Sequence, residues 1–344
     1  MKLEAKDNKV ILGMVGIGYW GPNLLRNFTQ IDKCRMKICC DLDEKSLKNV
    51  QSQYPDIITT KQYSDLLNDP DINAVVIAVS AAKHYDLVKL AIQKNKHVFV
   101  EKPLTLNISD AEDLVKLAEE KNVKLMVGHL MEYHPAIEKL KQMIQSGELG
   151  EVYYIYSQRV NLGRIRKDEN ALWSLAPHDI SIIMYLLESE PTTVNAVGQS
   201  YLQDGIEDVA FLNMTFPNNI MAHVQLSWLD PHKIRKTTVV GSKKMVVFDD
   251  MDTSEMIKIY DKGVENIAPP GSFGESMVLR FGDVIVPYIK LTEPLRLECL
   301  HFLDCIINDK QPRSDGIDGL KVVKVLQSAQ KSLKNGGIPI SIGD

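Results

Sequence analysis

A glycine-rich turn near the start of the chain constrains the fold more than any other stretch. The segment Gly16-Ile17-Gly18-Tyr19-Trp20-Gly21 follows the apolar run Val10–Val15 and precedes residues with helical spacing. A strand, a GxGxxG turn and a helix in this order are typical of a dinucleotide-binding βαβ unit. Gly16 permits a tight turn, Gly18 lets the backbone approach a pyrophosphate, and Gly21 lets the helix pack on the strand. We therefore expect these residues to bind a dinucleotide at the helix N-terminus.

An acidic residue after the second apolar run indicates which dinucleotide is bound. The run Met36–Cys40 ends in Asp41, about twenty residues after the last glycine, where a carboxylate accepts hydrogen bonds from the adenosine ribose. The same charge repels a 2′-phosphate. The sequence therefore favours NAD, with NADP as the less favoured cofactor.

The composition is that of an ordinary globular protein. The 344 residues allow about two domains, with 44% hydrophobic and 25% charged residues. No run approaches the roughly 20 apolar residues of a membrane span, and the first residues lack the apolar core of a signal peptide. The net charge is −5 and the basic residues are scattered, which argues against nucleic acid as a partner. We expect a cytoplasmic protein without a membrane partner.

The cysteines give no sign of a metal site or of disulfides. None of the five forms a CxxC motif or has metal-like spacing with histidine. We interpret them as reduced core residues and expect no bound metal. They are Cys34, Cys39, Cys40, Cys299 and Cys305.

Apolar runs and helical segments alternate through the first 127 residues. Such strands, apolar throughout and separated by amphipathic helices, predict a parallel sheet covered on both faces. We therefore assign residues 1–127 to an α/β, doubly wound Rossmann domain that binds NAD. The later strands of this domain are expected at Ala74–Val79, His97–Val100 and Lys124–Val127.

The pattern changes after Gly150. Several strand-like runs are joined directly by turns, such as Gly241-Ser242-Lys243-Lys244, which predicts a largely antiparallel sheet in an α+β domain over residues 128–344. A helix is expected from about Pro177 to Leu187, and a long loop over Asp261–Pro287. The expected strands are Val152–Val160, Thr193–Val197, Val209–Phe216, Ile220–Trp228, Lys236–Val240 and Met245–Phe248.

Loops that follow parallel strands should form the ligand site, because ligands bind outside the carboxyl ends of such strands. Ser80 and His84 follow the expected strand Ala74–Val79, Glu101 and Lys102 follow His97–Val100, and His129 follows Lys124–Val127. These loops should face the nicotinamide half of the cofactor.

Glu101-Lys102-Pro103, downstream of the glycine turn, and Gly147-Glu148-Leu149-Gly150 before the second domain resemble the Gfo/Idh/MocA family, which includes glucose-fructose oxidoreductase and myo-inositol dehydrogenase. The resemblance covers most of the chain. It implies an oxidoreductase that acts on a sugar or nucleotide-linked sugar with NAD or NADP, with Lys102 at the reacting carbon. His84 matches a family histidine, whereas Ser80 replaces the usual proline; we expect both to contact the cofactor.

The proposed role of Lys102 is chemically sound without the resemblance. Hydride loss from a carbinol carbon leaves negative charge on oxygen, which a nearby ammonium stabilises. Proximity to the cationic nicotinamide and partial burial should lower the pKa of Lys102 and help it to exchange protons. Glu101 either orients Lys102, contacts the cofactor or forms a structural ion pair.

A second proton-handling group is expected in the segment Leu172–Ser181. His178 falls on a family histidine, whereas Ser174 replaces the aspartate that precedes it by four positions. If Pro177 opens a helix, His178 lies at the positive end of the helix dipole, which favours a neutral imidazole able to act as a base. Asp179 either orients His178, binds a substrate hydroxyl or caps the helix.

Further substrate contacts are predicted from a basic run, Ser157–Lys167, because arginines suit phosphate or carboxylate recognition. We expect a nucleotide-diphosphate sugar or an acidic sugar, although these cations could equally be solvated. The arginine that the family often places after the sixth strand is missing where this chain reads Met131-Glu132-Tyr133. The candidate substrate contacts are His129, Tyr133, Arg159, Asn161, Arg164, Trp173 and Asp179.

The leading hypothesis is an NAD-dependent oxidoreductase for a ring secondary alcohol or ketone of a nucleotide-linked hexose, in either direction. The alternatives are a free sugar or polyol dehydrogenase and a cofactor-binding regulator without turnover. A homo-oligomer, either a dimer or a tetramer, is expected, with Val224, Leu226 and Trp228 as candidates for an exposed apolar sheet face.

Overall fold

The computed structural model describes residues 9–163, 165–266 and 277–342. The chain forms two compact units, Met1–Tyr133 with Thr292–Val323, and His134–Leu291 with Lys324–Asp344. The first unit therefore extends beyond the boundary expected after residue 127 and also includes the later segment Thr292–Val323. The reason is α8 (Pro294–Ile307), whose apolar side packs into the same buried cluster as β1 and α1.

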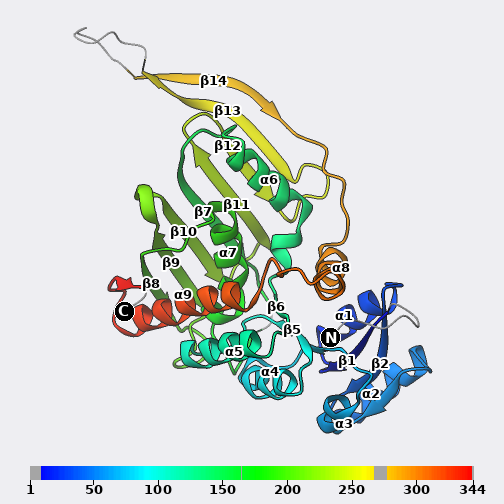
Figure 1. The fold of residues 1–344 in the computed structure, drawn as a ribbon. Helices are drawn as coiled ribbons and strands as arrows, with labels where there is room; N and C mark the ends of the chain where they lie inside the picture. Colours follow the sequence, from blue (N-terminus) through cyan, green and yellow to red (C-terminus); the bar gives the residue numbers. More distant parts are fainter. Residues whose placement is uncertain (1–8, 164, 267–276, 343–344) are drawn as a thin grey trace. The chain divides into compact units, whose positions relative to one another are not determined.

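The first unit is built on a six-stranded, wholly parallel sheet, as the sequence predicts. Its strand order is β3-β2-β1-β4-β5-β6, drawn in blue and cyan in Figure 1. Only β3 was not predicted, because its three residues are too few for a recognisable pattern. The strands are β1 Val10–Val15, β2 Cys34–Cys40, β3 Ile58–Thr60, β4 Ala74–Ile77, β5 His97–Glu101 and β6 Leu125–Gly128.

Helices cover both faces of this sheet, and successive residues of each strand point their side chains to opposite faces. Leu12 and Met14 pack with α1 (Gly21–Thr29) and α8. Val75 and Ile77 belong to the opposite cluster with α4 (His84–Gln93) and α5 (Ile108–Glu120). The remaining helical segments of this unit are α2 Glu44–Gln53, α3 Tyr63–Asn68, η1 Ala81–Lys83, η2 Leu130–Tyr133 and the start of α9, up to Val323.

The second unit contains a nine-stranded mixed sheet of order β14-β13-β12-β11-β7-β10-β9-β8-β15. Only β7 and β10 pair in parallel, and the other neighbours are antiparallel. The hairpin expected at Gly241–Lys244 is confirmed as the β11–β12 connection. The strands are β7 Val152–Val160, β8 Thr193–Gln199, β9 Val209–Thr215, β10 Met221–Ser227, β11 Ile234–Gly241, β12 Met245–Asp249, β13 Ile257–Asn266, β14 Met277–Ile285 and β15 Ile340–Ser341.

The long loop predicted over Asp261–Pro287 is wrong on either side of residues 267–276, which lie outside the described residues, because β13 and β14 form an antiparallel ladder with Val264 opposite Leu279. β14 is the edge strand and is exposed on both faces. No face of β14 is buried, so its sequence lacks the alternation by which strands are recognised.

One face of the second sheet is covered by α7 (Ala171–Leu187), which contacts β7, β9 and β10 (Figure 1). The expectation that Val224, Leu226 and Trp228 form an exposed face is therefore wrong, since each is at most 2% exposed. The opposite face of the same strands is open and presents Tyr154 and Met221, which are 44% and 58% exposed. Two further helices are α6 Pro135–Gln145 and α9 Gly316–Lys334.

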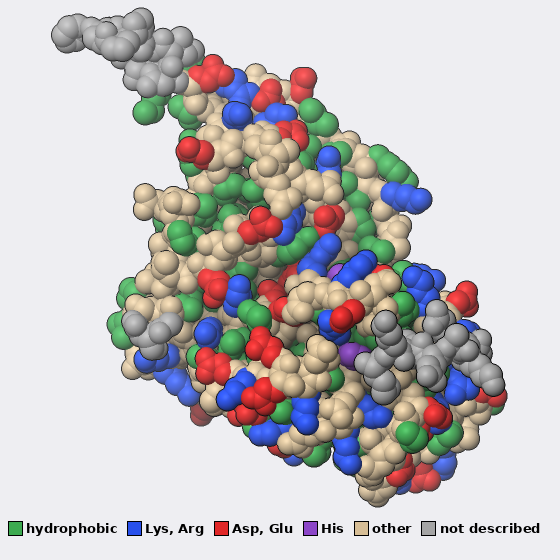
Figure 2. All heavy atoms as spheres, viewed as in Figure 1, with side chains coloured by type: hydrophobic (Ala, Val, Ile, Leu, Met, Phe, Trp, Pro, Cys, Tyr) green, Lys and Arg blue, Asp and Glu red, His purple; other side chains and the backbone are tan. Residues whose placement is uncertain are grey.

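Basic and acidic side chains alternate over the visible surface in Figure 2. Many form exposed ion pairs, such as Lys48 with Glu44, which individually contribute little to stability. Within the described residues, no helix has the length and apolar character needed to cross a bilayer.

Candidate active site

The glycine turn after β1 has the geometry of a dinucleotide cradle. Gly16 has φ +92°, and a Cβ there would lie 2.4 Å from the Ala78 carbonyl oxygen; a Cβ at Gly21 would lie 2.3 Å from the Gly16 carbonyl oxygen. The chain itself thus requires both glycines. A Cβ at Gly18, in contrast, would meet no described atom within 4 Å. Space that the protein does not fill here fits a closely approaching pyrophosphate, and the first turn of α1 carries no acidic residue to repel it.

Asp41 lies beside this turn, as predicted. One oxygen of its carboxylate accepts a hydrogen bond from the Ile17 backbone N–H at 2.5 Å, and the other from the Asp43 N–H at 2.8 Å. The end of β2 and the glycine turn therefore form one site, and the carboxylate position fits an adenosine ribose. Tyr19 is 83% exposed and is available to a ligand.

The loop after β5 is connected to the glycine turn through Glu101. Its carboxylate accepts hydrogen bonds from the Trp20 side chain and the Lys102 backbone N–H, and a Cβ at Gly128 would lie 3.2 Å from it. Burial raises the pKa of Glu101 to about 7, against the opposing effect of the Lys102 charge. Lys102 is half-buried, and its peptide bond to Pro103 is cis. The cofactor turn and the proposed catalytic lysine are thus parts of one packed structure.

His84 packs against this loop and contacts its backbone at Pro103. It is fully buried, with Nδ1 at 2.7 Å from the Pro103 carbonyl oxygen and Nε2 at 3.2 Å from that of Val79. Burial lowers the pKa of His84, so a neutral ring donates to a backbone carbonyl. Ser80, in contrast, is exposed at the start of η1. A cofactor contact remains a prediction for both residues, and the geometry favours Ser80.

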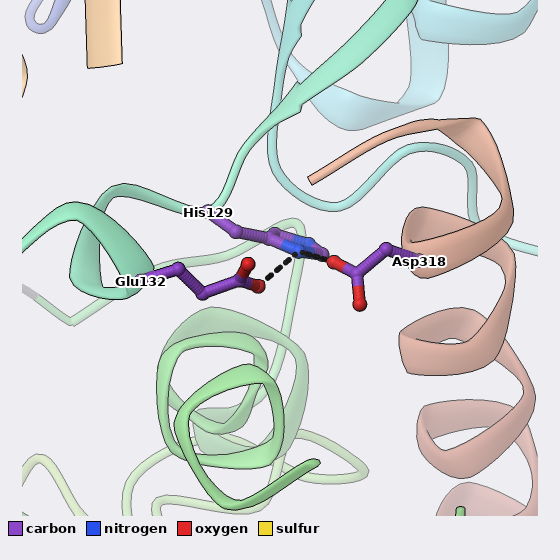
Figure 3. Close-up of side chains that lie close together, drawn as sticks. All are labelled: His129, Glu132 and Asp318. Carbon is purple, nitrogen blue, oxygen red and sulfur yellow. Dashed lines mark hydrogen bonds and ion pairs between the residues drawn. The ribbon is translucent and has the colours of Figure 1, made fainter. Parts of the chain in front are cut away.

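His129 belongs to a buried ionic cluster that no sequence pattern predicted (Figure 3). Its Nδ1 lies 2.6 Å from an Asp318 carboxylate oxygen and 3.3 Å from one of Glu132. Burial lowers the pKa of His129, but the hydrogen bonds to Asp318 and Glu132 outweigh it and raise the pKa to about 10. One nitrogen or oxygen atom from each of the three side chains lies within 4.8 Å of the other two. An imidazolium between two carboxyl groups explains this close spacing.

Tyr133 also has partners inside the first unit. Its side chain is 5% exposed, and its hydroxyl lies 3.0 Å from the Ser314 hydroxyl. For His129 and Tyr133 to contact a substrate, as predicted, the substrate would have to displace their present hydrogen-bond partners.

The buried cluster predicts an unusual dependence of stability on pH. Burial raises the pKa of Glu132 to about 8, and His129 is raised to about 10. Both folded values exceed the unfolded ones, so the folded state holds more protons between pH 7 and 9, and the free energy of unfolding should fall as pH rises. The slope is up to about 1.4 kcal/mol per pH unit for each excess proton.

Urea unfolding followed by circular dichroism at pH 7, 8 and 9 measures this slope. Glu132→Gln should flatten it, because the amide does not titrate. A stability that stays constant or rises over this range would contradict the assignment.

In the second unit, Arg159 and Asp179 form a buried ion pair. The Arg159 Nε lies 2.5 Å from one Asp179 oxygen, and the other oxygen accepts a hydrogen bond from the Ser157 hydroxyl at 2.6 Å. Asp179 is 1% exposed and Arg159 8% exposed. Both remain predicted substrate contacts, but their charges are already paired with each other in the interior of the second unit.

The predicted helix start at Pro177 is wrong. The helix α7 begins at Ala171, and the Asn170 side chain caps it by accepting the Trp173 N–H at 3.1 Å. Pro177 lies inside the helix, so the argument that the helix dipole keeps His178 neutral does not hold. Ser174 and His178 are one helical turn apart and share a face, and His178 is half-buried.

The remaining predicted contacts are dispersed. The Trp173 indole N–H donates to the Gln330 side chain at 3.1 Å, and Asn161 is half-buried after β7. Arg164 lies outside the described residues. Gln330 and Asp318, which engage predicted site residues, were missed because they come from a distant helix with no motif of its own.

Comparison with known proteins agrees with this geometry. Residues 10–129 match the model described as "Oxidoreductase family, NAD-binding Rossmann fold", and residues 137–247 match the GFO/IDH/MocA C-terminal domain. The chain is 27% identical to scyllo-inositol 2-dehydrogenase (NAD(+)) of Bacillus subtilis, over 99% of this chain and 97% of that protein. It is 26% identical to UDP-N-acetylglucosamine 3-dehydrogenase of Acidithiobacillus ferrooxidans, over 74% of this chain and 76% of that protein.

Solved structures share the fold. The structure of the same Acidithiobacillus ferrooxidans dehydrogenase superposes with a TM-score of 0.79 at 22% identity, covering 94% of this chain and 97% of that one. An oxidoreductase from Agrobacterium radiobacter, in complex with NAD+, L-tartaric acid and magnesium, gives 0.81 at 19% identity, covering 97% and 99%.

Proposed function

Because this chain belongs to the Gfo/Idh/MocA family of NAD-binding oxidoreductases acting on CH–OH groups, we propose that its substrate is a nucleotide-linked hexose, reacting at a ring secondary alcohol or its ketone. The observation that carries the proposal is the joining of the Lys102 loop to the glycine turn through Glu101 and Trp20. This contact supports a role for Lys102 beside the residues that we propose to hold NAD.

The residues that would hold NAD are those of the glycine turn together with Asp41 and Ser80. When bound, the nicotinamide supplies or accepts the hydride. Lys102 then stabilises the negative charge that develops on the substrate oxygen, because an ammonium is most effective where charge forms in the transition state. Its half-buried position strengthens this interaction relative to water.

His178 is the proposed second proton-handling residue. It lies on the Ser174 face of α7, and Ser174 supplies a hydroxyl where the family pattern has a carboxylate. We infer that His178 acts without a carboxylate partner at position 174, so any orientation of its ring comes from other contacts.

Two observations support a nucleotide-linked substrate. The segment after β7 contains Arg166 and Lys167 near Asn161, and bidentate guanidinium contacts suit diphosphates. A relative that aligns with this chain over 76% of its own length is named UDP-N-acetylglucosamine 3-dehydrogenase. Arg166 already pairs with Glu169 at 2.9 Å at a partly exposed position, and phosphate would have to compete with that pair.

A polyol dehydrogenase is the second candidate, favoured by the full-length match to a scyllo-inositol dehydrogenase. A panel of UDP- and dTDP-hexoses, free hexoses and inositols, assayed by NADH absorbance in both directions, separates the two. Turnover of nucleotide-linked sugars alone supports the proposal. Turnover of inositols or free sugars alone would replace it, and NAD binding without any turnover would favour a regulator.

We also propose that a second copy of the chain covers the open face of the β7–β10 region. Tyr154 stacks on Tyr156, and Phe211 on His223, leaving a flat, partly aromatic surface. Light scattering should give at least twice the monomer mass, and a monomer at working concentration would contradict this assignment.

A further inference from the structure

The edge strand β14 is apolar and exposed along most of its length. Tyr288, three residues beyond the end of the strand, is 90% exposed. Successive side chains of a strand point to opposite faces, so β14 is apolar on both faces, and a layer packed on one face alone would leave the other in water. The large apolar side chains of β14 that are 46–73% exposed are Met277, Val278, Leu279, Phe281, Val284 and Ile285.

The exposed apolar area of this segment is as large as a stable dimer needs. At about 60–120 Å² per aliphatic and 150–250 Å² per aromatic side chain, Tyr288 and the six side chains of β14 expose roughly 400–700 Å². The largest apolar patch on a monomer is typically about 300–600 Å² and is often functional. A stable interface buries about 800 Å² per partner, of which a little over half, or about 450 Å², is apolar. This segment alone therefore supplies enough apolar surface for an interface.

The backbone edge of β14 is also unprotected. It lies at the end of the sheet (Figure 1), and β13 is its only pairing partner among the described strands. Natural edge strands are usually blocked by lysine, proline or an outward charge, but Met277–Ile285 contains neither lysine nor proline. Its one arginine, Arg280, is paired with Asp261 and Glu265 of β13 and donates to the Lys243 carbonyl oxygen. The side chain that could guard the edge is therefore engaged within the sheet.

We propose that the edge of β14 pairs with β14 of a second copy of the chain, antiparallel and across a twofold axis. Such an interface must be self-complementary, and Met277–Phe281 meets this requirement. With Leu279 opposite the partner's Leu279, Met277 lies opposite the partner's Phe281, and apolar pairs of this kind stabilise antiparallel strands. Beyond Phe281 the register between β13 and β14 shifts. Because a bulge increases the local twist, we assign the pairing to the residues before it.

This surface is separate from the open face of the β7–β10 region, because β11, β12 and β13 lie between them in the sheet. Pairing through β14 needs neither NAD nor a sugar, so its tests are independent of the proposed substrate. Two different self-complementary surfaces give a tetramer, whereas β14 alone gives a dimer.

The first test is a disulfide across the twofold axis. Residues directly opposite each other in antiparallel strands have Cα atoms about 4.5–5.5 Å apart, which is within the range of a disulfide. Leu279→Cys should therefore give a covalent dimer on mild oxidation, seen on a non-reducing gel. The wild type should not, because its five cysteines are buried.

Val264→Cys is the matched control. Val264 is 55% exposed, against 64% for Leu279, and lies directly opposite Leu279 on β13. In the proposed dimer the two copies of Val264 are three strand spacings apart, about 14 Å, which is beyond the reach of a disulfide. A Leu279→Cys variant that forms no covalent dimer, or no more than Val264→Cys forms, overturns the proposal.

The second test measures the mass in solution by light scattering. Leu279→Lys places a charge in the paired edge and should halve the wild-type mass, with or without an interface on the open face. Leu279 is exposed, so the substitution leaves the core intact. Leu90→Lys, at a 44% exposed position on α4, should leave the mass unchanged. A Leu279→Lys variant that keeps the wild-type mass overturns the proposal as well.

Discussion

Lys102→Met should lower kcat/KM by about 10² to 10³-fold, or roughly 2.7–4 kcal/mol of transition-state stabilisation. The methionine keeps the length and apolar stem of lysine but removes the ammonium that stabilises the substrate oxygen. NAD affinity should change little, because the residues that fit the dinucleotide lie in the glycine turn and at Asp41. Steady-state kinetics on the sugar identified by the panel, with calorimetric NAD binding, measures both effects.

Lys121→Met is the matched control, since Lys121 is exposed at the end of α5 in the same unit. It should leave kcat/KM unchanged. If Lys102→Met turned over substrate at the wild-type rate while Lys121→Met did the same, Lys102 would have no catalytic role.

Asp179→Ala should destabilise the protein by about 3–5 kcal/mol, because it leaves the buried Arg159 guanidinium without its charge partner. The Ser157 hydroxyl loses its acceptor in the same change. Equilibrium unfolding in urea, with a probe in the second unit such as the fluorescence of Trp228, measures the loss.

The double variant Arg159→Met with Asp179→Leu is the control, since it replaces both charges by apolar groups of similar size. Such a replacement is often neutral or stabilising, so most of the loss should be recovered. If Asp179→Ala instead kept full stability and raised only KM for the sugar, the pair would be a substrate contact rather than a structural one.

The first unit was predictable because its information is local. The Val10–Val15 run, the glycine turn and the Asp41 position each follow from neighbouring residues, and the structure joins Asp41 to Ile17 as the motif requires. The apolar strands of a parallel sheet are also easy to recognise, since both of their faces are buried. The structure describes the same strands to within one or two residues.

The pairing of His129 with Asp318 was not predictable, because the two residues are distant in sequence. Asp318 follows His129 by 189 residues and belongs to the first unit because the segment Thr292–Val323 packs there. No spacing rule identifies such partners. The edge strand β14 was missed for the opposite reason, since exposure on both faces removes the pattern.

The amino-acid sequence by itself determined the glycine turn and the parallel sheet, because each depends on residues that are neighbours along the chain. Only the tertiary structure decided which charges are paired. Arg159 and His129, which remain predicted substrate contacts, are paired with Asp179 and Asp318, since a charge removed from water during folding is stable only beside an opposite one.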